Sequence, residues 1–373
     1  MKTIAIVAGA RPNFMKIAPI VRALRSAGNG LGFHIVHTGQ HYDREMNDVF
    51  FEELGIPPPD VCFEPGGGTH AEQTGRVMLG FEQYCRAYRP ALVLVVGDVN
   101  STLACAIVAK KQGIPLAHVE AGLRSGDMAM PEEINRIVTD SITDFFFVTE
   151  PSAISNLLRE GKAPDRIFHV GHVMVDNLVY QRDRLAEAHD ARLCSSILKT
   201  RYPRYGVVTL HRPSNVDDAA TFSRIALALR DISGELPLIF PVHPRTRANV
   251  QKFDIDLGRG VVLTPPLSYM EFLNLWKDSV MVLTDSGGLQ EETTALGVPC
   301  VTLRENTERP ITVDEGTNVV AGTHPARIRH AVAAVLRGDA KTGRRPELWD
   351  GRAAERIVEI LRRELLPSLR AAA

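Results

Sequence analysis

The sequence predicts an α/β protein built from two doubly wound domains, each with a parallel sheet. Short apolar runs alternate with amphipathic helical patterns along all 373 residues. Runs that are apolar throughout are typical of parallel strands covered on both faces. A chain of this length is too long for one compact core. The same alternation starts again after a polar stretch in the middle of the chain, which indicates a second sheet.

Eleven segments are predicted as strands, and helical patterns lie between them. The strands are residues 3–9, 33–39, 91–98, 115–122, 145–150 and 167–172 in the first half, and 205–212, 236–244, 260–266, 280–288 and 298–305 in the second. Ile17, Ile20, Val21 and Leu24 recur at helical spacing between the first two strands. This spacing predicts a helix with one apolar face.

The predicted join between the domains lies in residues 172–205, an Arg- and Asp-rich stretch. We therefore expect a first domain over residues 1–172 and a second, nucleotide-binding domain over residues 173–351. Residues 352–373 contain a last helical pattern, which we expect to pack back on the first domain.

Charge and apolar run length exclude several partner classes. The chain has 43 Lys and Arg against 44 Asp and Glu, a net charge of −1, and no long block of one sign. This balance predicts neither a nucleic-acid surface nor binding to an anionic membrane. No apolar run approaches membrane length, and the N-terminus reads as a strand rather than a signal peptide. We expect a soluble, cytoplasmic protein.

The cysteines show no metal or redox spacing, so the sequence predicts buried, reduced thiols and no metal site. They are Cys62, Cys85, Cys105, Cys194 and Cys300. No zinc-protease motif appears either. The first strand is not followed by the glycine pattern of dinucleotide-binding enzymes, and no phosphate-binding P-loop motif occurs.

The segment 283–300 is the most informative stretch of the chain. An apolar run ends in Asp285 and Ser286, two glycines follow, and a helical pattern then carries a pair of glutamates. A helix that starts at glycines presents bare N–H groups and a positive dipole end to an anion. A glutamate one turn into the helix can reach ribose hydroxyls. The segment predicts a holder for a nucleotide diphosphate, the alternative being an ordinary strand–helix corner.

Polar residues follow the first-half strands, where ligands of open α/β sheets bind. Arg11 and Lys16 lie near a predicted helix start, where a phosphate would offset their charge; alternatively, both are solvated surface cations. Asp98 either supports the turn after its strand or faces a ligand. His118 and Glu120 are two residues apart, so we expect both side chains to leave the same face near the strand end.

Two further charged residues follow at the start of a predicted helix. Glu132 and Arg136 are spaced i and i+4, so they are either functional or simply an ion pair.

In the second half, His211 and His243 end strands and are either ligand contacts or satisfied structural residues. We expect a cleft between the domains to join the first-half carboxylates to the diphosphate turn. This combination suits proton abstraction or acid catalysis on a nucleotide sugar.

With these motifs assembled, the chain resembles the non-hydrolysing UDP-N-acetylglucosamine 2-epimerase family. The matching stretches are GARPNFMKIAPI (9–20), HTGQH (37–41), VVGDVNST (95–102), HVEAGLRSGD (118–127), PEEINR (131–136), TLHRPSN (209–215), PVHP (241–244), LTDSGGLQEE (283–292), RENTERP (304–310) and GTNVVAG (316–322). They follow in order over nearly the whole chain. The resemblance implies two Rossmann-like domains facing across a cleft, the glycosyltransferase-B arrangement, a homodimer and no organic cofactor.

The resemblance also implies a mechanism and residue roles. A base removes the proton on sugar carbon 2 and UDP departs by elimination, which leaves a 2-acetamidoglucal. UDP adds back to the glycal, and carbon 2 is reprotonated from the other face. By match, the acid/base candidates are Asp98, Glu120 and Glu132, with Arg136 orienting them. The implied substrate contacts are Arg11 and His211 at the diphosphate, Lys16 beside it, Ser286, Gly287 and Gly288 at the phosphates, Glu292 at the ribose and Phe272 at the uracil.

The chain departs from the family pattern at a few positions. Asn13 stands where the commoner form has Glu, and residues 211–215 read HRPSN rather than HRREN. Asp43 and Glu72 stand where members with a second, activating UDP-sugar site have other groups, so we expect no such activation. Other stretches resemble the subgroup that acts on UDP-diacetamido-glucuronic acids.

Four alternative functions share part of this pattern. A UDP-diacetamido-glucuronic acid substrate would need an extra cation, for which Arg76 or Arg124 are candidates. A hydrolysing 2-epimerase would use nearly the same residues and release N-acetylmannosamine. A glycosyltransferase of the same fold needs an acceptor groove and not three carboxylates. A nucleotide-sugar binding module would not need the acid/base set either.

Overall fold

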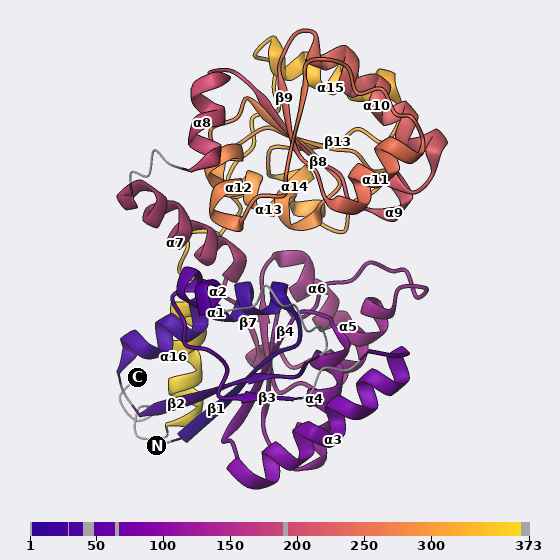
Figure 1. Cartoon of the computed structure of the whole chain (residues 1–373). Helices are drawn as coiled ribbons and strands as arrows, with labels where there is room; N and C mark the ends of the chain where they lie inside the picture. Colours follow the sequence, from indigo (N-terminus) through magenta and orange to yellow (C-terminus); the bar gives the residue numbers. More distant parts are fainter. Residues whose placement is uncertain (1, 29, 40–47, 64–66, 189–192, 367–373) are drawn as a thin grey trace. The chain divides into compact units, whose positions relative to one another are not determined.

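The chain forms two compact α/β units in the computed structural model, which describes residues 2–28, 30–39, 48–63, 67–188 and 193–366 (Figure 1). The first unit contains Met1–Asn177 and the chain from Glu347 on; the second is Leu178–Pro346. The change from one unit to the other falls within helix α7 (Val173–Ala188). The predicted fold class, two Rossmann-like units with parallel sheets, is confirmed.

The first sheet has seven parallel strands within the described residues, in the order β3-β2-β1-β4-β5-β6-β7. They are β1 (Lys2–Ala8), β2 (Leu31–His37), β3 (Val61–Cys62), β4 (Leu92–Val96), β5 (Leu116–Val119), β6 (Phe145–Val148) and β7 (Ile167–His169). The order reverses between β1 and β4, which pair through Ile4 and Leu92. Open α/β sheets bind ligands beyond the carboxyl ends of the strands at such a reversal.

Helices cover both faces of this sheet. Helix α1 (Arg11–Ala27) packs on α16 (Ala353–Leu365) on one face, and α3, α4 and α5 lie on the other (Figure 1). The remaining bounds are α2 (Asp48–Leu54), α3 (His70–Tyr88), α4 (Asn100–Lys111), α5 (Pro131–Ile142), α6 (Pro151–Arg159) and a 3-10 turn (Pro164–Arg166). The predicted apolar stripe of α1 is fully buried or nearly so.

The second sheet repeats this plan with six described parallel strands, in the order β10-β9-β8-β11-β12-β13. They are β8 (Gly206–Thr209), β9 (Leu238–Pro241), β10 (Val261–Thr264), β11 (Met281–Thr284), β12 (Cys300–Thr302) and β13 (Asn318–Val320). Here the order reverses between β8 and β11. Residues that follow these two strands therefore lie where a ligand is expected.

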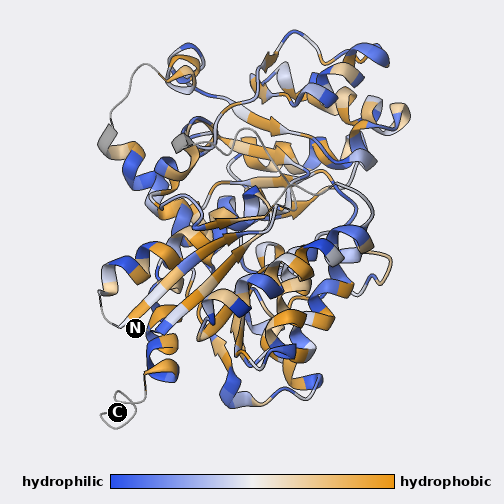
Figure 2. Cartoon of the chain, turned by 60° about the horizontal axis from the view of Figure 1, so that its bottom comes forward, coloured by the Kyte–Doolittle hydropathy of each residue, from blue (hydrophilic) through white to orange (hydrophobic). Residues whose placement is uncertain are grey.

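Helices α10 and α15 pack together on one face of the second sheet, and α12, α13 and α14 lie on the other (Figure 1). The bounds are α8 (Cys194–Arg201), α9 (Pro213–Val216), α10 (Ala219–Ser233), α11 (Pro244–Lys252), α12 (Tyr269–Trp276), α13 (Gly287–Leu296), α14 (Pro310–Asp314) and α15 (Pro325–Leu336). The strands carry the continuous apolar runs, whereas the helices are apolar on one side only (Figure 2).

The segment after Glu347 is tied into the core of the first unit. Trp349 is buried, and its indole N–H donates to the Thr149 carbonyl at 3.2 Å. Asp176 accepts hydrogen bonds from the N–H groups of Ala353 and Ala354 at 3.1 and 2.7 Å, which caps α16. Burial raises the pKa of Asp176 to about 6, although these N–H groups act in the opposite direction.

Two expectations about the fold need correction. Strands β3 and β13 are absent from the eleven predicted strands, because two and three residues are too few to give a pattern. Cys62 and Cys194 are exposed, not buried. The other three thiols are buried, and burial raises the pKa of Cys85 to about 12 and that of Cys300 to about 11.

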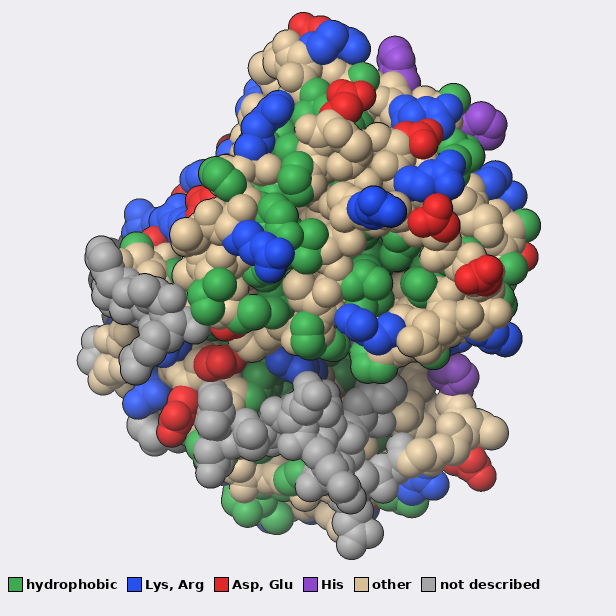
Figure 3. All heavy atoms as spheres, turned by 45° about the horizontal axis from the view of Figure 1, so that its top comes forward, with side chains coloured by type: hydrophobic (Ala, Val, Ile, Leu, Met, Phe, Trp, Pro, Cys, Tyr) green, Lys and Arg blue, Asp and Glu red, His purple; other side chains and the backbone are tan. Residues whose placement is uncertain are grey.

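Helix length and surface charge bear on the partner classes of this chain. Over the described residues, none of the helices combines the length and the apolar character that a bilayer crossing demands. On the face that Figure 3 shows, Lys and Arg side chains are interspersed with Asp and Glu. The described residues of that face therefore form no continuous basic field.

Candidate active site

The carboxyl edge of the first sheet brings together groups that follow β1, β4 and β5. The Lys16 ammonium on α1 donates to Glu120 Oε2 at 2.5 Å. Gly97 lies beside this pair with φ 66°, and a Cβ at that position would lie 2.9 Å from Lys16 Nζ. Glycine is therefore required here for the amine to approach the backbone. Lys16 is a partner of a carboxylate, so the solvated-cation alternative for it is wrong.

Glu120 has the geometry of a functional residue. It is 4% exposed and has φ 67°, in the left-handed region that costs a non-glycine residue about 1–2 kcal/mol. Its second oxygen, Oε1, is buried and has no hydrogen-bond partner among the described residues. A strained backbone and an unpartnered buried carboxylate oxygen both point to a group held for a ligand.

Asp98 contacts Arg136, and Arg136 also contacts Glu133. Arg136 Nη1 donates to Asp98 Oδ2, and its Nε donates to Glu133 Oε2 at 2.9 Å. The N-cap residue of α4 is Val99, which makes no side-chain cap bond, so Asp98 is not the N-cap of this helix. The Arg136 side chain is 9% exposed, and the Asp98 side chain that it contacts is 31% exposed. A nearly buried guanidinium therefore orients a carboxylate that solvent still reaches.

Glu133 is the acidic partner of Arg136, and Glu132 is not. The i, i+4 ion pair between Glu132 and Arg136 is therefore wrong. Glu133 also accepts from the N–H groups of Ser125 and Gly126 at 2.9–3.0 Å. Burial would raise the pKa of Glu133, but these bonds and Arg136 outweigh it and lower the pKa. Glu132, in the first turn of α5, is half-buried and makes no hydrogen bond to any described residue.

His118 and Glu120 both lie beside Gly97. The His118 ring is completely buried between Asp140 on α5 and the Gly97 carbonyl, at 2.7 and 2.8 Å. A Cβ at Gly97 would lie 3.9 Å from Glu120 Oε2. Strand β5 ends at Val119, and that the two side chains leave the same face stays a prediction.

Arg11 and Asn13 lie at the start of α1. The Arg11 guanidinium sits 5.1 Å from the centre of the Phe50 ring, a cation–π contact that orients it. Asn13 is buried, and its Oδ1 accepts from the N–H groups of Gly9 and Ala10 at 3.1 and 3.0 Å. An amide oxygen therefore satisfies the two N–H groups just before this helix, where the family pattern has a carboxylate.

In the second unit, His211 follows β8 and Asp285 follows β11. His211 Nδ1 lies 3.0 Å from Asp285 Oδ1, and the ring is half-exposed. The buried Asp285 also accepts from the N–H groups of His211 and Arg212 and from Asn215 Nδ2. Burial would raise the pKa of Asp285, but the hydrogen bonds and charge of His211 and the N–H groups outweigh it and lower the pKa.

Helix α13 begins at the predicted diphosphate turn. Ser286 is its N-cap residue and makes no side-chain cap bond, so the first N–H groups of the helix are not capped by it. A Cβ at Gly287 would lie 2.8 Å from Glu308 Oε1, whereas a Cβ at Gly288 would meet open space. A helix start that Ser286 leaves uncapped, with room beside Gly288, suits an anion.

The two glutamates of α13 have different partners. Glu291 lies 2.8 Å from Arg309 Nε. Glu292 is 7% exposed, and its Oε1 accepts from the Tyr269 hydroxyl at 3.0 Å. Burial, then the Glu292 charge and hydrogen bond, raise the pKa of Tyr269. Phe272, on the same short helix as Tyr269, is half-buried.

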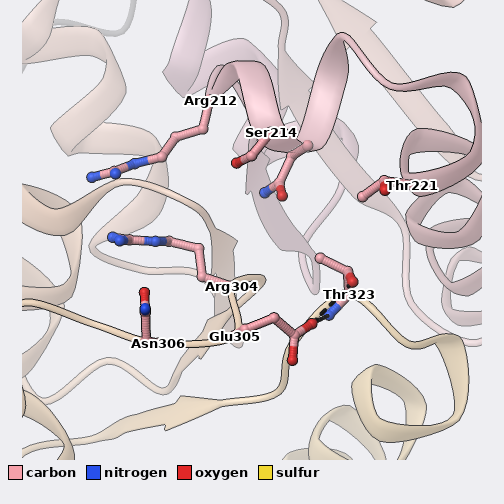
Figure 4. A pocket seen from close by; sticks show the side chains of 8 residues that line it. Arg212, Ser214, Thr221, Arg304, Glu305, Asn306 and Thr323 are labelled. Atoms are coloured by element: carbon pink, nitrogen blue, oxygen red, sulfur yellow. Dashed lines mark hydrogen bonds between the residues drawn. The ribbon is translucent and has the colours of Figure 1, made fainter. Parts of the chain in front are cut away.

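A pocket of about 360 Å³ lies at the carboxyl edge of the second sheet (Figure 4). The side chains of Arg212 and Arg304 extend in the same direction from the loops after β8 and β12. Both contact Glu308, at 2.9 and 2.7 Å. On the other side of the pocket, the Thr323 N–H donates to Glu305 at 2.9 Å. Two guanidinium groups make this pocket a second anion-attracting feature of the unit.

Three expected ligand contacts have structural partners. His243 caps α11, where its Nδ1 accepts from the Arg245 N–H at 3.3 Å. Arg124 is held by Asp140 and Glu160, so it is not a spare cation for a second substrate carboxylate. Arg76 is exposed and donates to the Gly67 carbonyl.

The residues tied to activation are only partly described. Asp43 lies outside the described residues. Glu72 accepts from the Thr69 N–H at 2.8 Å and caps α3. This bond lowers the pKa of Glu72. Within the described ranges, no group of three or more His, Cys, Asp or Glu is arranged to hold a metal ion.

The family model described as UDP-N-acetylglucosamine 2-epimerase matches residues 23–362. The chain belongs to this family. It is 39% identical to the UDP-N-acetylglucosamine 2-epimerase of Methanococcus maripaludis, over 98% of this chain and 100% of that protein. It is also 39% identical to the UDP-2,3-diacetamido-2,3-dideoxy-D-glucuronate 2-epimerase of Pseudomonas aeruginosa, over 97% and 99%.

A solved structure agrees with this assignment. The fold matches the Methanocaldococcus jannaschii UDP-GlcNAc 2-epimerase, solved in complex with UDP-GlcNAc and UDP, with a TM-score of 0.84 and 39% identity. The match covers 96% of this chain and 99% of that one. As a member of the 2-epimerase family, the protein is an isomerase.

Proposed function

We propose that this epimerase interconverts UDP-GlcNAc and UDP-ManNAc by elimination and re-addition of UDP. The observation that carries the proposal is Glu120, a strained, buried carboxylate with one oxygen on Lys16 and the other without a partner among the described residues. Asp98 lies on the adjacent turn with its own cation, Arg136. Inversion at a carbon needs acid/base groups for two faces, and this edge supplies several carboxylates.

In the proposed reaction, a carboxylate takes the proton from carbon 2 of the sugar. The carbon 2–carbon 1 double bond forms as the bond from carbon 1 to the UDP oxygen breaks. UDP leaves as an anion beside the 2-acetamidoglucal. A second acid group then protonates carbon 2 on its opposite face, and the UDP oxygen re-forms the bond to carbon 1 as that carbon becomes electrophilic, so the atoms and charges balance without a cofactor.

We assign the acid/base roles to Asp98, Glu120 and Glu132. Arg136 orients Asp98, as its contact with that carboxylate supports. Lys16 neutralises Glu120. Arg11 and His211 stabilise the departing diphosphate, for which the Asp285 contact orients the His211 ring.

The nucleotide end of the substrate is assigned to the second unit. Ser286, Gly287 and Gly288 bind phosphate through the N–H groups at the start of α13. Glu292 binds the ribose hydroxyls, and Phe272 stacks on the uracil. Arg212 and Arg304, both paired with Glu308, lie at the same sheet edge and present guanidinium donors there.

A second candidate substrate is a UDP-diacetamido-glucuronic acid. The 39% identity to the Pseudomonas aeruginosa enzyme, equal to that of the first archaeal relative, supports it. Of the two cations named for the extra carboxylate, Arg124 is already held by two acids. Incubation with each UDP-sugar and comparison of kcat/KM distinguishes the two substrates.

The reaction is tested by NMR of UDP-GlcNAc incubated with the enzyme in D2O, without added metal or NAD. We expect deuterium at carbon 2 of both epimers, with UDP still attached. Free N-acetylmannosamine as the first product would show the hydrolysing reaction instead. A product whose carbon 2 keeps its original hydrogen would exclude proton abstraction altogether.

Replacing Glu292 by Ala is expected to weaken UDP affinity by about tenfold or more, because a charged hydrogen-bond partner is lost. Tyr269→Phe removes only the hydroxyl that holds Glu292 and should weaken UDP binding less. Calorimetry with UDP measures both. Unchanged affinity in Glu292→Ala would overturn the ribose assignment.

We expect hyperbolic kinetics without activation by substrate. Glu72 places a carboxylate at the start of α3, where the resemblance puts the second UDP-sugar site, and like charges repel a diphosphate. The reverse reaction from UDP-ManNAc should start without a lag. A lag that disappears when a trace of UDP-GlcNAc is added would show that the second site exists.

We also propose a homodimer, which the family resemblance implies. Light scattering on a size-exclusion column should give twice the chain mass of 41.0 kDa. A mass equal to one chain would refute it.

A further inference from the structure

His118 is a buried histidine that the proposed reaction does not use directly. Its ring has no solvent exposure. Nδ1 lies 2.7 Å from Asp140 Oδ1, and Nε2 lies 2.8 Å from the Gly97 carbonyl oxygen. Both neighbours are hydrogen-bond acceptors when Asp140 is ionised. In this arrangement both ring nitrogens face acceptors, so both are placed to donate hydrogen bonds.

Asp140 has the partners of an ionised carboxylate. Besides His118, it accepts from the Gly122 N–H at 2.9 Å and from Arg124 Nη1 at 2.8 Å. Burial would raise the pKa of Asp140, but the charge and hydrogen bond of His118, Arg124 and the Gly122 N–H outweigh it and lower the pKa. Arg124 in turn makes two bonds to Glu160, at 2.8 and 2.7 Å. Arg124 therefore compensates the buried charge of Asp140, and Glu160 compensates the charge of Arg124.

This network joins the two turns that carry Asp98 and Glu120. Gly97, whose carbonyl His118 holds, is the residue before Asp98. Gly122, whose N–H Asp140 holds, is two residues after Glu120. Both turns contain left-handed residues, since φ is 66° at Gly97 and 67° at Glu120. Backbone in such conformations keeps its shape only where the surroundings determine it.

We infer that His118 is a positioning residue. Through its contact with the Gly97 carbonyl, it fixes the position of the Asp98 carboxylate relative to the Glu120 carboxylate. This inference rests on the proposed function of those two carboxylates. A displacement of about 1 Å in a reacting group costs on the order of 100-fold in rate. The chain therefore uses a fully buried histidine, held by Asp140 of α5, to fix a backbone carbonyl next to an acid/base residue.

Two variants separate the two contacts of the ring. The amide nitrogen of His118→Gln reaches the position of Nε2 and can still donate to the Gly97 carbonyl. The amide nitrogen of His118→Asn reaches the position of Nδ1 and can donate only to Asp140. Each variant loses one buried hydrogen bond, so the unfolding midpoints should be similar.

We expect kcat to fall by about 100-fold or more in His118→Asn and by less than about tenfold in His118→Gln. KM and calorimetric UDP affinity should stay within roughly threefold of the parent in both, because the nucleotide contacts are elsewhere. Equal losses in the two variants would overturn the inference. If the parent itself shows no exchange at carbon 2 in D2O, the proposed function fails rather than the role of His118.

A second measurement is an NMR spectrum of the parent protein, with the spectrum of His118→Gln as its reference. Nitrogen-15 NMR of histidine-labelled parent protein at pH 7–8 should show one ring with two slowly exchanging N–H protons, absent from the spectrum of His118→Gln. A neutral ring with one N–H would contradict the double donor. This readout remains informative if His118→Asn proves unstable.

Discussion

Glu120→Gln is expected to lower turnover by about 10²–10⁴-fold, the effect of removing one positioned acid/base group. The amide keeps the size of the side chain and its buried position but cannot accept the carbon 2 proton. UDP affinity should change far less than turnover, since Glu120 is assigned to the sugar and not to the nucleotide. Steady-state kinetics and calorimetry with UDP measure the two quantities.

A matched control is Glu82→Gln on α3, which changes an exposed glutamate paired with Arg86. This surface pair should affect neither turnover nor UDP binding. If Glu120→Gln retained full turnover, Glu120 could not be an acid/base group. Asp98→Asn and Glu132→Gln, measured in the same assays, show which of the three carboxylates act as acid/base groups.

The second large effect is expected at Asp285. Asp285→Ala leaves the N–H groups of His211 and Arg212 and the amide of Asn215 without their acceptor. Each unsatisfied buried donor costs about 1–3 kcal/mol, so the free energy of unfolding should fall by about 3 kcal/mol or more. The His211 ring also loses its partner, so turnover should fall as well. Urea unfolding followed by circular dichroism measures the stability change.

This stabilisation has a defined pH window. The folded pKa of Asp285 is lowered below the unfolded value of about 3.9. Its contribution is therefore fully present above about pH 4 and is lost as the pH falls through the folded pKa. The difference in stability between parent and Asp285→Ala should be present above about pH 4 and shrink at more acidic pH. Asp256→Asn, which changes an exposed pair with Arg230 in the same unit, should leave the free energy of unfolding nearly unchanged.

Most of the fold was predictable because the strands are continuous apolar runs. Each of the eleven predicted strand segments overlaps a strand of the structure, and the helical stripe from Ile17 to Leu24 is buried. Strands β3 and β13 were not predictable, since edge strands of two and three residues depend on pairing with β2 and β12 rather than on their own pattern. The strand order was likewise set by tertiary contacts.

The site was predictable in composition but not in pairing. Spacing suggested Glu132 as the partner of Arg136, whereas Glu133 has that position because the N–H groups of Ser125 and Gly126 converge on it. A loop fold of this kind leaves no periodic signal. The burial of His118 was equally hidden, because the sequence does not show that Glu120 adopts a left-handed conformation. The only sequence signal that could have suggested Glu133 as a partner of Arg136 is that two glutamates are adjacent at the helix start.

The contacts of Asp176 with the start of α16 and of Trp349 with the Thr149 carbonyl have a consequence for synthesis on the ribosome, because they join the end of the chain to residues made much earlier. The second unit is continuous in sequence and is complete before the last helix of the first unit has been translated. Domains commonly fold from the N-terminus as they emerge. Here we expect the second unit to become protease-resistant first. Until α16 has been made, the apolar face of α1 stays exposed, and we expect chaperones to bind it. Proteolysis of nascent chains stalled at residue 346 would report this reversed order.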